Sequence, residues 1–466
     1  MTLSTLPGTI GDLRASNYQV LPVRQELRKN LIAKIRSEEI VFPGIIGFEH
    51  TVIPQLENAI LAGQDIILLG ERGQAKSRLI RSMVTLLDEF IPKIADCEIN
   101  DDPYAPICRV CRNKVAEQGD DTQIQWIGRD ERYSEKLATP DISIADLIGE
   151  IDPIKVAEGH YLSDELVIHY GLVPRTNRGI FCINELPDLA ERIQVGLFNL
   201  MEERDVQIKG YRIRLPLDVY VVSTANPEDY TNRGRIVTPL KDRYGSQIHT
   251  HYPKTIEEEI AIMEQERTRF PDEDSMVIPY YMKEILAEIT SQARESSEIN
   301  QRSGVSCRVS ISNFETLLGN ALRRSIIHGE QYVCPRTSDL PYIMASFSGK
   351  IELETFEEGR ESRVTDDLTR RGVLRVFGGV FEVDELERIV TAFDMGNTAE
   401  TSSEKPASEY LAMLAQVDGL ADAVKKVTTD ERPEVVASAV EFILEGLHLN
   451  RRLNCERTSA GYLYRR

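Results

Sequence analysis

The sequence contains no apolar run that approaches the ~20 residues a helix needs to cross a bilayer. Residues 1–16 also lack the basic-then-apolar pattern of a secretory signal. Basic residues are outnumbered by acidic ones, 55 against 75, and the formal net charge of −20 disfavours non-specific binding of nucleic acid through the overall field. From these absences we expect neither a membrane contact nor a nucleic-acid partner.

Cysteines are scarce, with seven in 466 residues. An odd number in a long chain argues against a disulfide framework and for a reducing compartment, so we expect a cytoplasmic protein. Hydrophobic residues make up 41% and charged residues 28%, which is typical of a globular protein. The length predicts about two to four domains.

The most informative stretch is DIILLGERGQAKSRLIRSM, residues 65–83. Ile66–Leu69 form a run typical of a strand buried on both faces, glycines interrupt it, and a helical pattern follows Lys76-Ser77. Such a loop presents backbone amides to an anion, while Lys76 adds a charge and the Ser77 hydroxyl can ligate magnesium. An ordinary strand–turn–helix unit is the alternative. Ala75 stands where the phosphate-loop consensus has glycine, which requires a negative φ or only small strain there.

Two later apolar runs end in polar residues, as strands of an open α/β sheet do at the edge where ligands bind. Ile180–Ile183 precedes Asn184-Glu185, and Val219–Ser223 precedes Thr224, Ala225 and Asn226. Glu185 could orient or deprotonate a water that attacks a γ-phosphate, or simply cap a helix. An amide at position 226 could hydrogen-bond the phosphate or that water.

Two loops allow both a functional and a plain interpretation. In FPGIIGFEH, residues 42–50, Phe42 and Ile45–Gly47 could wall an adenine ring, or the stretch could be a simple turn. The basic segment 232–245, NRGRIVTPLKDRYG, could aim an arginine at phosphate or could be a solvated surface loop.

The segment 95–114, ADCEINDDPYAPICRVCRNK, carries three of the cysteines. Cys108 and Cys111 have C-x2-C spacing, and Cys97 lies upstream. Three thiolates with Asp101 or Glu98 could hold Zn2+ tetrahedrally. Because no second C-x2-C pair completes four sulfurs, reduced structural cysteines are the alternative.

Four motifs in this order resemble those of the MoxR-type AAA+ ATPases and of the related ATPase subunit of magnesium chelatase: GERGQAKS (70–77), GLVPRTNRGIFCINE (171–185), STANPED (223–229) and LKDRYG (240–245). The resemblance covers roughly residues 40–350. It implies an α/β fold with an AAA+ phosphate-loop parallel sheet sandwiched by helices, followed by an all-α lid and a helical C-terminal region.

By position, the resemblance implies that Lys76 contacts the β- and γ-phosphates and that Glu185 is the catalytic base. Ser77 and Asn184 correspond to the magnesium ligands, although the family usually has Asp where Asn184 stands, so this chain brings no negative charge there. Asn226 corresponds to the sensor of the γ-phosphate.

Two arginines complete the implied site. Arg243 in LKDRYG matches the arginine finger that acts on the ATP of the neighbouring subunit, and Arg308 in SCRVSI matches the second sensor. The residues implied to bind the nucleotide are Ile46, Gly70, Glu71, Arg72, Gly73, Gln74, Ala75, Lys76, Ser77 and Arg308.

Some chelatase ATPase subunits carry an insertion of the form C-x3-CDP followed by C-x2-C, and segment 95–114 is similar, with Asp101 in place of one cysteine. The resemblance therefore adds weight to a metal or redox role for Cys97, Cys108 and Cys111. It also implies two inserted hairpins, at residues 151–170 and 205–215.

With the motifs placed, pattern and composition divide the chain into six parts: 1–40, a loose arm and a helix; 41–252, the α/β core with the cysteine insertion and hairpin inserts; 253–350, the helical lid; 351–395, a helical extension broken at Gly378-Gly379; 396–408, a linker; and 409–466, a helical C-terminal region.

A finger that acts on a neighbour requires a ring, which the resemblance implies to be a homo-oligomer, a hexamer. Such a ring would hydrolyse ATP with Mg2+ to remodel or activate a partner, as a chaperone for a protein with a von Willebrand factor A domain or as the metal-insertion motor of a chelatase. Two alternatives remain. One is a nucleotide-dependent scaffold with weak or no hydrolysis, suggested by Ala75 and Asn184. The other is a transcription activator of the same superclade, although no helix-turn-helix is evident.

Overall fold

The computed structural model describes residues 6–152, 154, 165–207, 214–226, 235–271, 273–301, 303–354, 359–458 and 461–466. The chain forms two compact units, residues 1–251 and 252–466. Among the helices in these described ranges, none combines the length and apolarity that spanning a bilayer requires.

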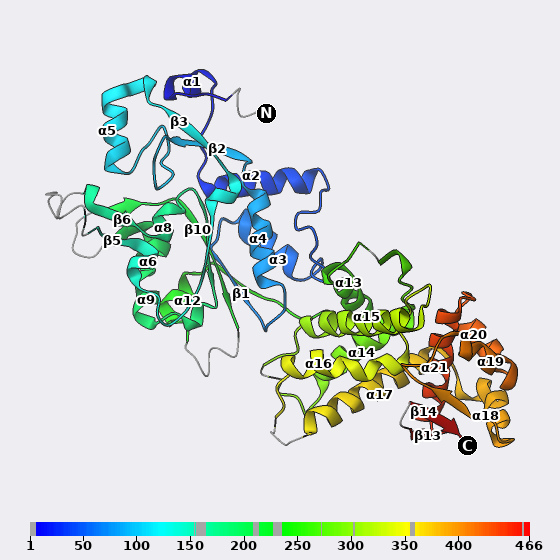
Figure 1. Ribbon diagram of the computed structural model, residues 1–466. Coiled ribbons are helices and arrows are strands. Elements are labelled where there is room, and N and C mark those ends of the chain that lie inside the picture. The colour runs from blue at the N-terminus through cyan, green and yellow to red at the C-terminus, as the bar shows by residue number, and fades with distance from the viewer. Residues whose placement is uncertain are drawn as a thin grey trace. The chain divides into compact units, whose positions relative to one another are not determined.

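A five-stranded parallel sheet is the centre of the first unit (Figure 1). Its strands, in spatial order, are β11 (Ser246–His249), β1 (Ile66–Leu69), β10 (Val219–Ala225), β7 (Gly179–Asn184) and β4 (Tyr133–Leu137). The three central strands are buried along their whole length, as strands covered on both faces must be. The predicted α/β fold with a parallel sheet is confirmed.

Helices cover both faces of this sheet, and alternate residues of each strand point to opposite faces. Ile66 and Leu68 pack into one core, whereas Ile67 and Leu69 pack into the other. The first face is covered by α2 (Val23–Arg36), α3 (Val52–Leu61) and α4 (Lys76–Ser82). The second is covered by α6 (Ile144–Ile148), α8 (Leu172–Arg175), α9 (Glu191–Gly196), α10 (Phe198–Glu202) and α12 (Thr238–Arg243).

The register of the sheet brings three strand ends to one edge. Leu69, the last residue of β1, pairs with Ala225 of β10 and with His249 of β11. Ile183 of β7 pairs with Ser223 of β10. Because the strands are parallel, the loops that follow them leave the sheet on the same side, which is where open α/β sheets bind ligands.

Three antiparallel strand pairs are attached to this core. β2 (Phe90–Ile94) pairs with β3 (Ile124–Gly128), and α5 (Arg109–Gln118) lies between them in sequence. β5 (Gly149–Ile151) pairs with β6 (Ile168–Tyr170), and β8 (Asp205–Gln207) with β9 (Arg214–Pro216). The latter two pairs stand at the predicted hairpins, whose tips at 155–164 and 208–213 lie outside the described residues.

The N-terminal arm differs from the prediction of a loose segment. It forms α1 (Ile10–Ala15), which is capped by the Thr9 hydroxyl, and Ile10 and Leu13 pack against Ile124 of β3. The arm has too few apolar residues to show a clear helical period, and it is ordered by packing on β3.

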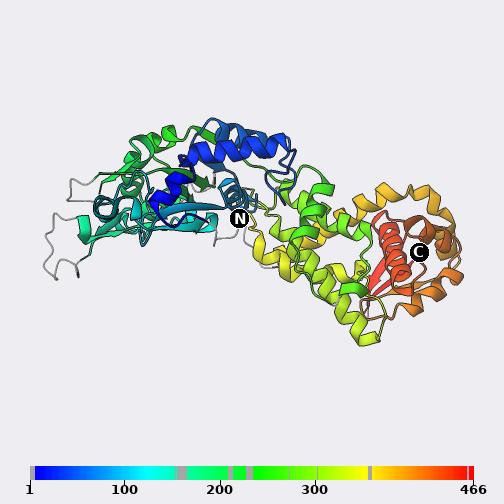
Figure 2. The ribbon, with the colours of Figure 1, turned by 90° about the horizontal axis from the view of Figure 1, so that it is seen from above.

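The second unit is mostly helical around one continuous core. Its helices are α13 (Ile256–Glu266), α14 (Tyr280–Glu295), α15 (Arg308–His328), α16 (Met344–Phe347), α17 (Arg360–Val380), α18 (Glu387–Asp394), α19 (Ser408–Gln416), α20 (Leu420–Val427) and α21 (Pro433–Leu449). Figure 2 shows α21, in red, among the orange helices, and its side chains are buried along almost its whole length. Tyr281 of α14 stacks on Phe442 of α21 with ring centroids 4.5 Å apart.

Two predictions for the second unit are wrong. Residues 396–408 are not a linker, because β12 (Ala399–Thr401) within them pairs with β14 (Tyr462–Arg465), which also pairs with β13 (Asn454–Arg457). The C-terminal region is therefore not purely helical. The predicted break at Gly378-Gly379 lies one residue from the observed one, because α17 ends at Val380 and Phe381 is extended before the next helical turn begins at Val383.

Candidate nucleotide-binding site

The loop between β1 and α4 has the backbone conformation of a phosphate cradle. Gly70 admits no side chain, because a Cβ there would lie 1.9 Å from Thr250 Oγ1. Gly73 has φ +75° and Ala75 has φ +53° with ψ +14°, so both are left-handed. Of the two conditions expected for an alanine here, a negative φ or only small strain, the first is not met. Ala75 adopts the conformation that favours the consensus glycine, at a strain of about 1–2 kcal/mol.

The loop is fastened to the neighbouring strand by Gln74. The buried Gln74 Oε1 accepts hydrogen bonds from Glu71 N at 3.1 Å and from Thr250 Oγ1 at 2.6 Å. Thr250 follows β11, and its own amide donates to Leu69 O at 2.8 Å. A side chain of the loop thus binds to the sheet edge itself, which limits the conformations the loop can take.

Lys76 and Ser77 open α4, whose N-terminus is not capped by any side chain. Lys76 Nζ donates to the carbonyls of Gly70 and, at 2.6 Å, of Glu71, so it lies across the loop. A cation over a ring of main-chain amides is suited to a phosphate group. The flanking Arg72 is exposed at the loop's surface.

Asn184 and Glu185 lie together at the end of β7. Asn184 Nδ2 donates to Glu135 Oε1, and its Oδ1 accepts from Thr224 Oγ1 at 3.3 Å. Glu185 donates its amide to the same Thr224 hydroxyl at 3.0 Å, and its exposed side chain leaves the strand with φ +55°. A non-glycine residue in this conformation is typical of a functional strand end.

Glu135 is a residue of this site that the sequence did not indicate. It lies on β4, next to β7, and accepts from Arg81 Nε at 2.8 Å and Nη2 at 3.0 Å, and from Tyr133 Oη at 2.9 Å. Partial burial opposes its ionisation, but the hydrogen bonds from Arg81 and Tyr133 prevail and keep the pKa of Glu135 below its usual value. A carboxylate therefore contacts the Asn184 amide, at the position where the resemblance implies an Asp. The polar strand YSEKL gave no signal of this contact.

Asn226, directly after β10, is almost fully buried, and its Oδ1 accepts no hydrogen bond from any described residue. An unmatched buried acceptor costs about 1–3 kcal/mol. It is therefore suited to a donor that arrives with the ligand. Residues 227–234, which include the start of the predicted basic loop, lie outside the described residues.

Arg243, the predicted finger, ends α12 and makes its contacts with α10 and with its own helix. Its Nε donates to Glu202 Oε2 at 3.1 Å and its Nη1 to Pro239 O at 2.7 Å. Its guanidinium also lies 4.6 Å from the centroid of the Phe198 ring. The structure thus brings the phosphate loop, Asn184, Glu185 and Asn226 to one sheet edge but holds Arg243 on a helix of its own chain.

The remaining two nucleotide-binding candidates, Ile46 and Arg308, lie in other parts of the chain. Ile46 is half-buried in the loop before α3, between the buried Ile45 and Phe48. Phe48 packs edge-on against His251, with ring centroids 5.0 Å apart. Arg308 is exposed at the first position of α15 in the second unit. The roles of both residues stay predictions.

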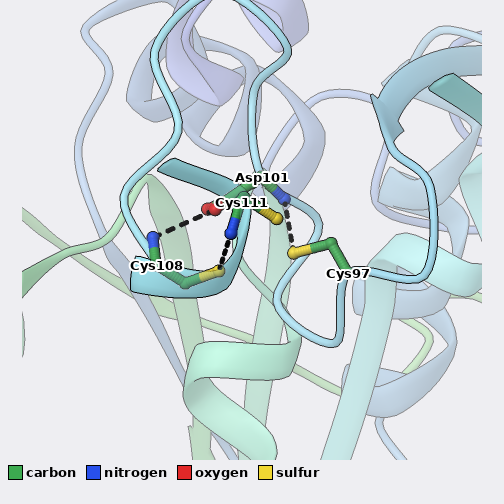
Figure 3. Close-up of side chains that lie close together, drawn as sticks. All are labelled: Cys97, Asp101, Cys108 and Cys111. Atoms are coloured by element: carbon green, nitrogen blue, oxygen red, sulfur yellow. Dashed lines mark hydrogen bonds between the residues drawn. The ribbon is translucent and has the colours of Figure 1, made fainter. Parts of the chain in front are cut away.

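The three cysteines of the second candidate site do come together (Figure 3). One ligand atom each from Cys97, Asp101, Cys108 and Cys111 lies within 4.8 Å of the other three, and all four residues are buried. Glu98, the other carboxylate considered, is exposed and lies 3.7 Å from Arg175 instead. Of the two acidic residues, Asp101 is therefore the one placed with the sulfurs.

The electrostatics of this cluster differ from those of free thiols. Hydrogen bonds from the Cys108 and Cys111 thiols lower the pKa of Cys97. Burial, together with the charge of Cys97, raises the pKa of Asp101 to about 6. The cluster thus concentrates ionisable donors in a space closed to water.

No family model matches the sequence. Curated proteins similar to it include a magnesium-chelatase subunit ChlI homolog of Methanocaldococcus jannaschii, 24% identical over 234 residues, which covers 48% of this chain and 58% of that protein. Another is the magnesium-chelatase subunit ChlI of a Nostoc species, 27% identical over 263 residues, which covers 53% of this chain and 64% of that protein. The chain thus matches less than two thirds of the length of each relative.

A solved complex between subunits BchI and BchD of magnesium chelatase contains a chain that is 19% identical with a TM-score of 0.36, covering 70% of this chain and 98% of that one. A TM-score this low does not by itself establish a shared fold. The sequence relatives, the order of the four motifs and the convergence of three of them at one edge of a parallel sheet identify the chain as a magnesium-chelatase-like AAA+ protein.

Proposed function

We propose that the first unit binds ATP with Mg2+ and hydrolyses it, and that hydrolysis does work on a partner protein. The observation that supports this most is the loop 70–75. Its left-handed Gly73 and Ala75 and the position of Lys76 form a cradle at the same sheet edge as Glu185 and Asn226.

Each residue at this edge has a different role in binding or hydrolysing ATP. Lys76 and the loop amides hold the β- and γ-phosphates. Ser77 binds Mg2+, with the Asn184 amide beside it, and the ion when bound neutralises charge on the phosphates. Glu185 orients the attacking water or takes its proton, because its exposed carboxylate directly follows β7 at the same sheet edge as the cradle. Asn226 Oδ1 accepts a hydrogen bond from the same water.

Glu135 supplies the negative charge that Asn184 lacks. An amide supplies no negative charge, yet the Glu135 carboxylate accepts its hydrogen bond and is ionised at neutral pH. The negative charge that the resemblance implies at residue 184 is therefore carried by the neighbouring side chain of Glu135. This favours a hydrolysing enzyme over the nucleotide-dependent scaffold, which remains the second candidate because of Asn184.

We further propose that the chain works as a ring, in which Arg243 leaves Glu202 and reaches the ATP of a neighbouring subunit. The partner is a chelatase-type subunit, by analogy with the solved BchI–BchD complex, or a protein with a von Willebrand factor A domain, as the resemblance of the motifs implies. Every cysteine of the chain is a free thiol, which suits the cytoplasm.

The test is Mg2+-dependent ATP turnover, measured together with nucleotide affinity. Glu185→Gln should lower turnover by about 10²–10⁴-fold while keeping ATP affinity, since it removes the base and leaves the cradle. Lys76→Ala should abolish ATP binding. Arg36→Ala, which removes an exposed arginine at the end of α2 and outside the nucleotide site, is the control for the charge. Wild-type protein that binds ATP but shows no turnover would favour the scaffold, and protein that binds no adenine nucleotide would refute both.

A further inference from the structure

The cysteine segment, defined here as residues 95–111, has a donor set that the nucleotide site does not use. It contains three sulfurs and one carboxylate, each within 4.8 Å of the other three. In a tetrahedral zinc site with Zn–S bonds of about 2.3 Å, ligand atoms lie about 3.8 Å apart. The cluster therefore needs inward shifts of at most about 1 Å to enclose an ion.

Hydrogen bonds from backbone amides already hold these side chains around a common centre, where the ion would bind. Cys97 Sγ accepts a hydrogen bond from Asp101 N at 3.4 Å, and Cys108 Sγ accepts one from Cys111 N at 3.3 Å. Asp101 Oδ2 accepts from Cys108 N at 3.0 Å. Figure 3 shows these three hydrogen bonds, two of which end on sulfur. Together they join the C-x3-D turn to the C-x2-C turn.

One buried polar atom of this cluster lacks a hydrogen-bond partner among the residues that the structure describes. Asp101 is 0% exposed, and its Oδ1 accepts no hydrogen bond from any residue that the structure describes. A carboxylate oxygen buried without a donor is unfavourable, and buried charges are normally paired or bound to metals. Beside three thiol groups, a cation is the partner that satisfies it.

The apolar core of the segment is too small to order it alone. Its buried members are Ile94, Cys97, Ile99, Cys108 and Cys111, so three of the five are the cysteines themselves. Small units that cannot bury a sufficient core are usually held by disulfides or metals. Disulfides are not present, since all three cysteines are free.

We propose that Cys97, Asp101, Cys108 and Cys111 bind one structural zinc ion. Thiolates favour a soft or borderline ion, and four buried protein ligands leave no position open for a substrate, so the site is structural rather than catalytic. This proposal does not depend on nucleotide hydrolysis.

The ion would support the base of the first hairpin. Cys108 caps α5, and Glu165, just before β6, accepts hydrogen bonds from Arg109 N at 2.8 Å and Arg112 Nη2 at 3.3 Å. Tyr170, the last residue of β6, packs against the cysteine core. Zinc therefore fixes α5, and α5 in turn fixes the strand pair β5–β6.

The first test is the metal content of the purified full-length protein, reconstituted with zinc and freed of loosely bound ions. We expect one zinc per chain in the wild type and less than a tenth of that in the Cys108→Ser, Cys111→Ser double variant. Cys455→Ser, which removes a half-buried thiol of β13, is the matched control and should keep the full complement. A wild type without zinc, or a double variant that keeps it, would overturn the proposal.

A second test separates ligation from folding. Replacing zinc by cobalt should give the visible absorption of a tetrahedral site with thiolate charge-transfer bands in the near ultraviolet. Asp101→Cys should keep the tetrahedral spectrum with stronger charge transfer, and Asp101→Asn should weaken metal affinity at least about 10-fold. Octahedral cobalt spectra, or identical affinities in the wild type and Asp101→Asn, would show that Asp101 is not a ligand.

A third test addresses the structural role. Chelation should speed tryptic cleavage after Arg109, Arg112 and Lys114 by an order of magnitude or more, and added zinc should restore protection, because the ion orders α5. Cleavage within α2 should stay unchanged. Equal cleavage rates at the α5 sites with and without zinc would contradict the role.

Discussion

The phosphate loop and the cysteine segment both connect a strand to a helix, yet they are held in different ways. Residues 70–75 lie between β1 and α4 and are held from outside, by Gln74 bound to Thr250 at the end of the neighbouring strand. The cysteine segment lies between β2 and α5, and its cysteines pack on one another in a small core, while Asn177 Nδ2 donates to Ile99 O at 3.1 Å.

This difference matches the two kinds of ligand that we propose. A loop that exchanges its ligand must remain accessible, and Glu71, Gly73 and Lys76 are only half-buried. A segment that keeps its ligand can close around it, as the four buried donors do. Changes at the sheet edge should therefore alter turnover and leave stability nearly intact, whereas changes in the cysteine segment should do the reverse.

The largest effect should come from Arg243→Ala. An arginine finger contributes about 10³–10⁵ in turnover, so ATPase activity should fall by that factor while ATP affinity stays the same. Stability should change little, because the ion pair with Glu202 is partly exposed and such pairs contribute about 0–1 kcal/mol. Steady-state turnover and calorimetric ATP binding measure the two quantities.

Glu202→Gln is the matched control for Arg243→Ala, since it breaks the same ion pair and keeps the arginine. It should retain turnover or raise it, because Arg243 is then easier to release from α10. Wild-type turnover in Arg243→Ala would refute the finger, and an equal loss in Glu202→Gln would point to a structural role of the pair.

On the other side of the comparison, the Cys108→Ser, Cys111→Ser double variant should lose thermal stability. We expect the melting midpoint of the first unit to fall by about 5–10 °C, since in a unit of this size 1 kcal/mol corresponds to about 2–4 °C. ATP affinity should stay within about 2-fold of the wild type, because Cys108 and Cys111 pack in a small core of their own, separate from the cores beneath the phosphate loop. A large loss of ATP affinity without a change in the melting midpoint would contradict a structural role of these cysteines and place them in the nucleotide site.

A smaller effect, with a distinct pH signature, should follow from Glu135→Gln. Because the folded pKa of Glu135 lies below its ordinary value of 4.5, its ionised form stabilises the fold fully above that pH. This contribution is lost as the pH falls through the folded pKa. Denaturant unfolding between pH 3 and 6 should therefore show a shallower acid loss in the variant than in the wild type, and equal slopes would contradict the assignment.

The same Glu135→Gln variant should bind Mg2+–ATP more weakly, because the only carboxylate in contact with Asn184, among the described residues, is neutralised. Asn184→Asp should restore the affinity in that background by returning a charge to the strand end. If Asn184→Asp does not restore the affinity, Glu135 does not influence Mg2+–ATP binding through residue 184.

The smallest effect should come from Ala75→Gly. Glycine relieves the left-handed strain of about 1–2 kcal/mol but has a more flexible unfolded state, so a net gain of up to about 1 kcal/mol is expected. Ala116→Gly, in the exposed part of α5, is the control and should lose about 0.5–1 kcal/mol. Urea denaturation measures both, and a loss in Ala75→Gly equal to that of the control would show that position 75 is not strained.

Much of the first unit followed from local patterns. The runs at Ile66–Leu69, Ile180–Ile183 and Val219–Ser223 predicted the three central strands, and the structure extends them by two residues at most. Short apolar runs bounded by glycine or polar residues have few other ways to be buried. The strands β4 and β11, which are more polar, were not recognised.

The predictions that failed for the 396–408 stretch and the N-terminal arm depended on long-range contacts. The polar stretch 396–408 has the composition of a linker, but it pairs with a strand about sixty residues further along the chain. The arm at residues 1–20 is ordered by packing on β3. Composition describes what a segment prefers when it is alone, and pairing with a distant strand overrides that preference.

Local sequence was sufficient for the phosphate loop, the strand ends and the C-x2-C pair, because each depends on neighbours within a few residues. The contacts that complete the sites depend instead on register and packing. Glu135 meets Asn184 across two strands, and the buried ion pair of Glu26 with Arg132 joins residues 106 positions apart. No short-range pattern encodes such distances, since they are set only when the sheet has formed and the helices have packed on it.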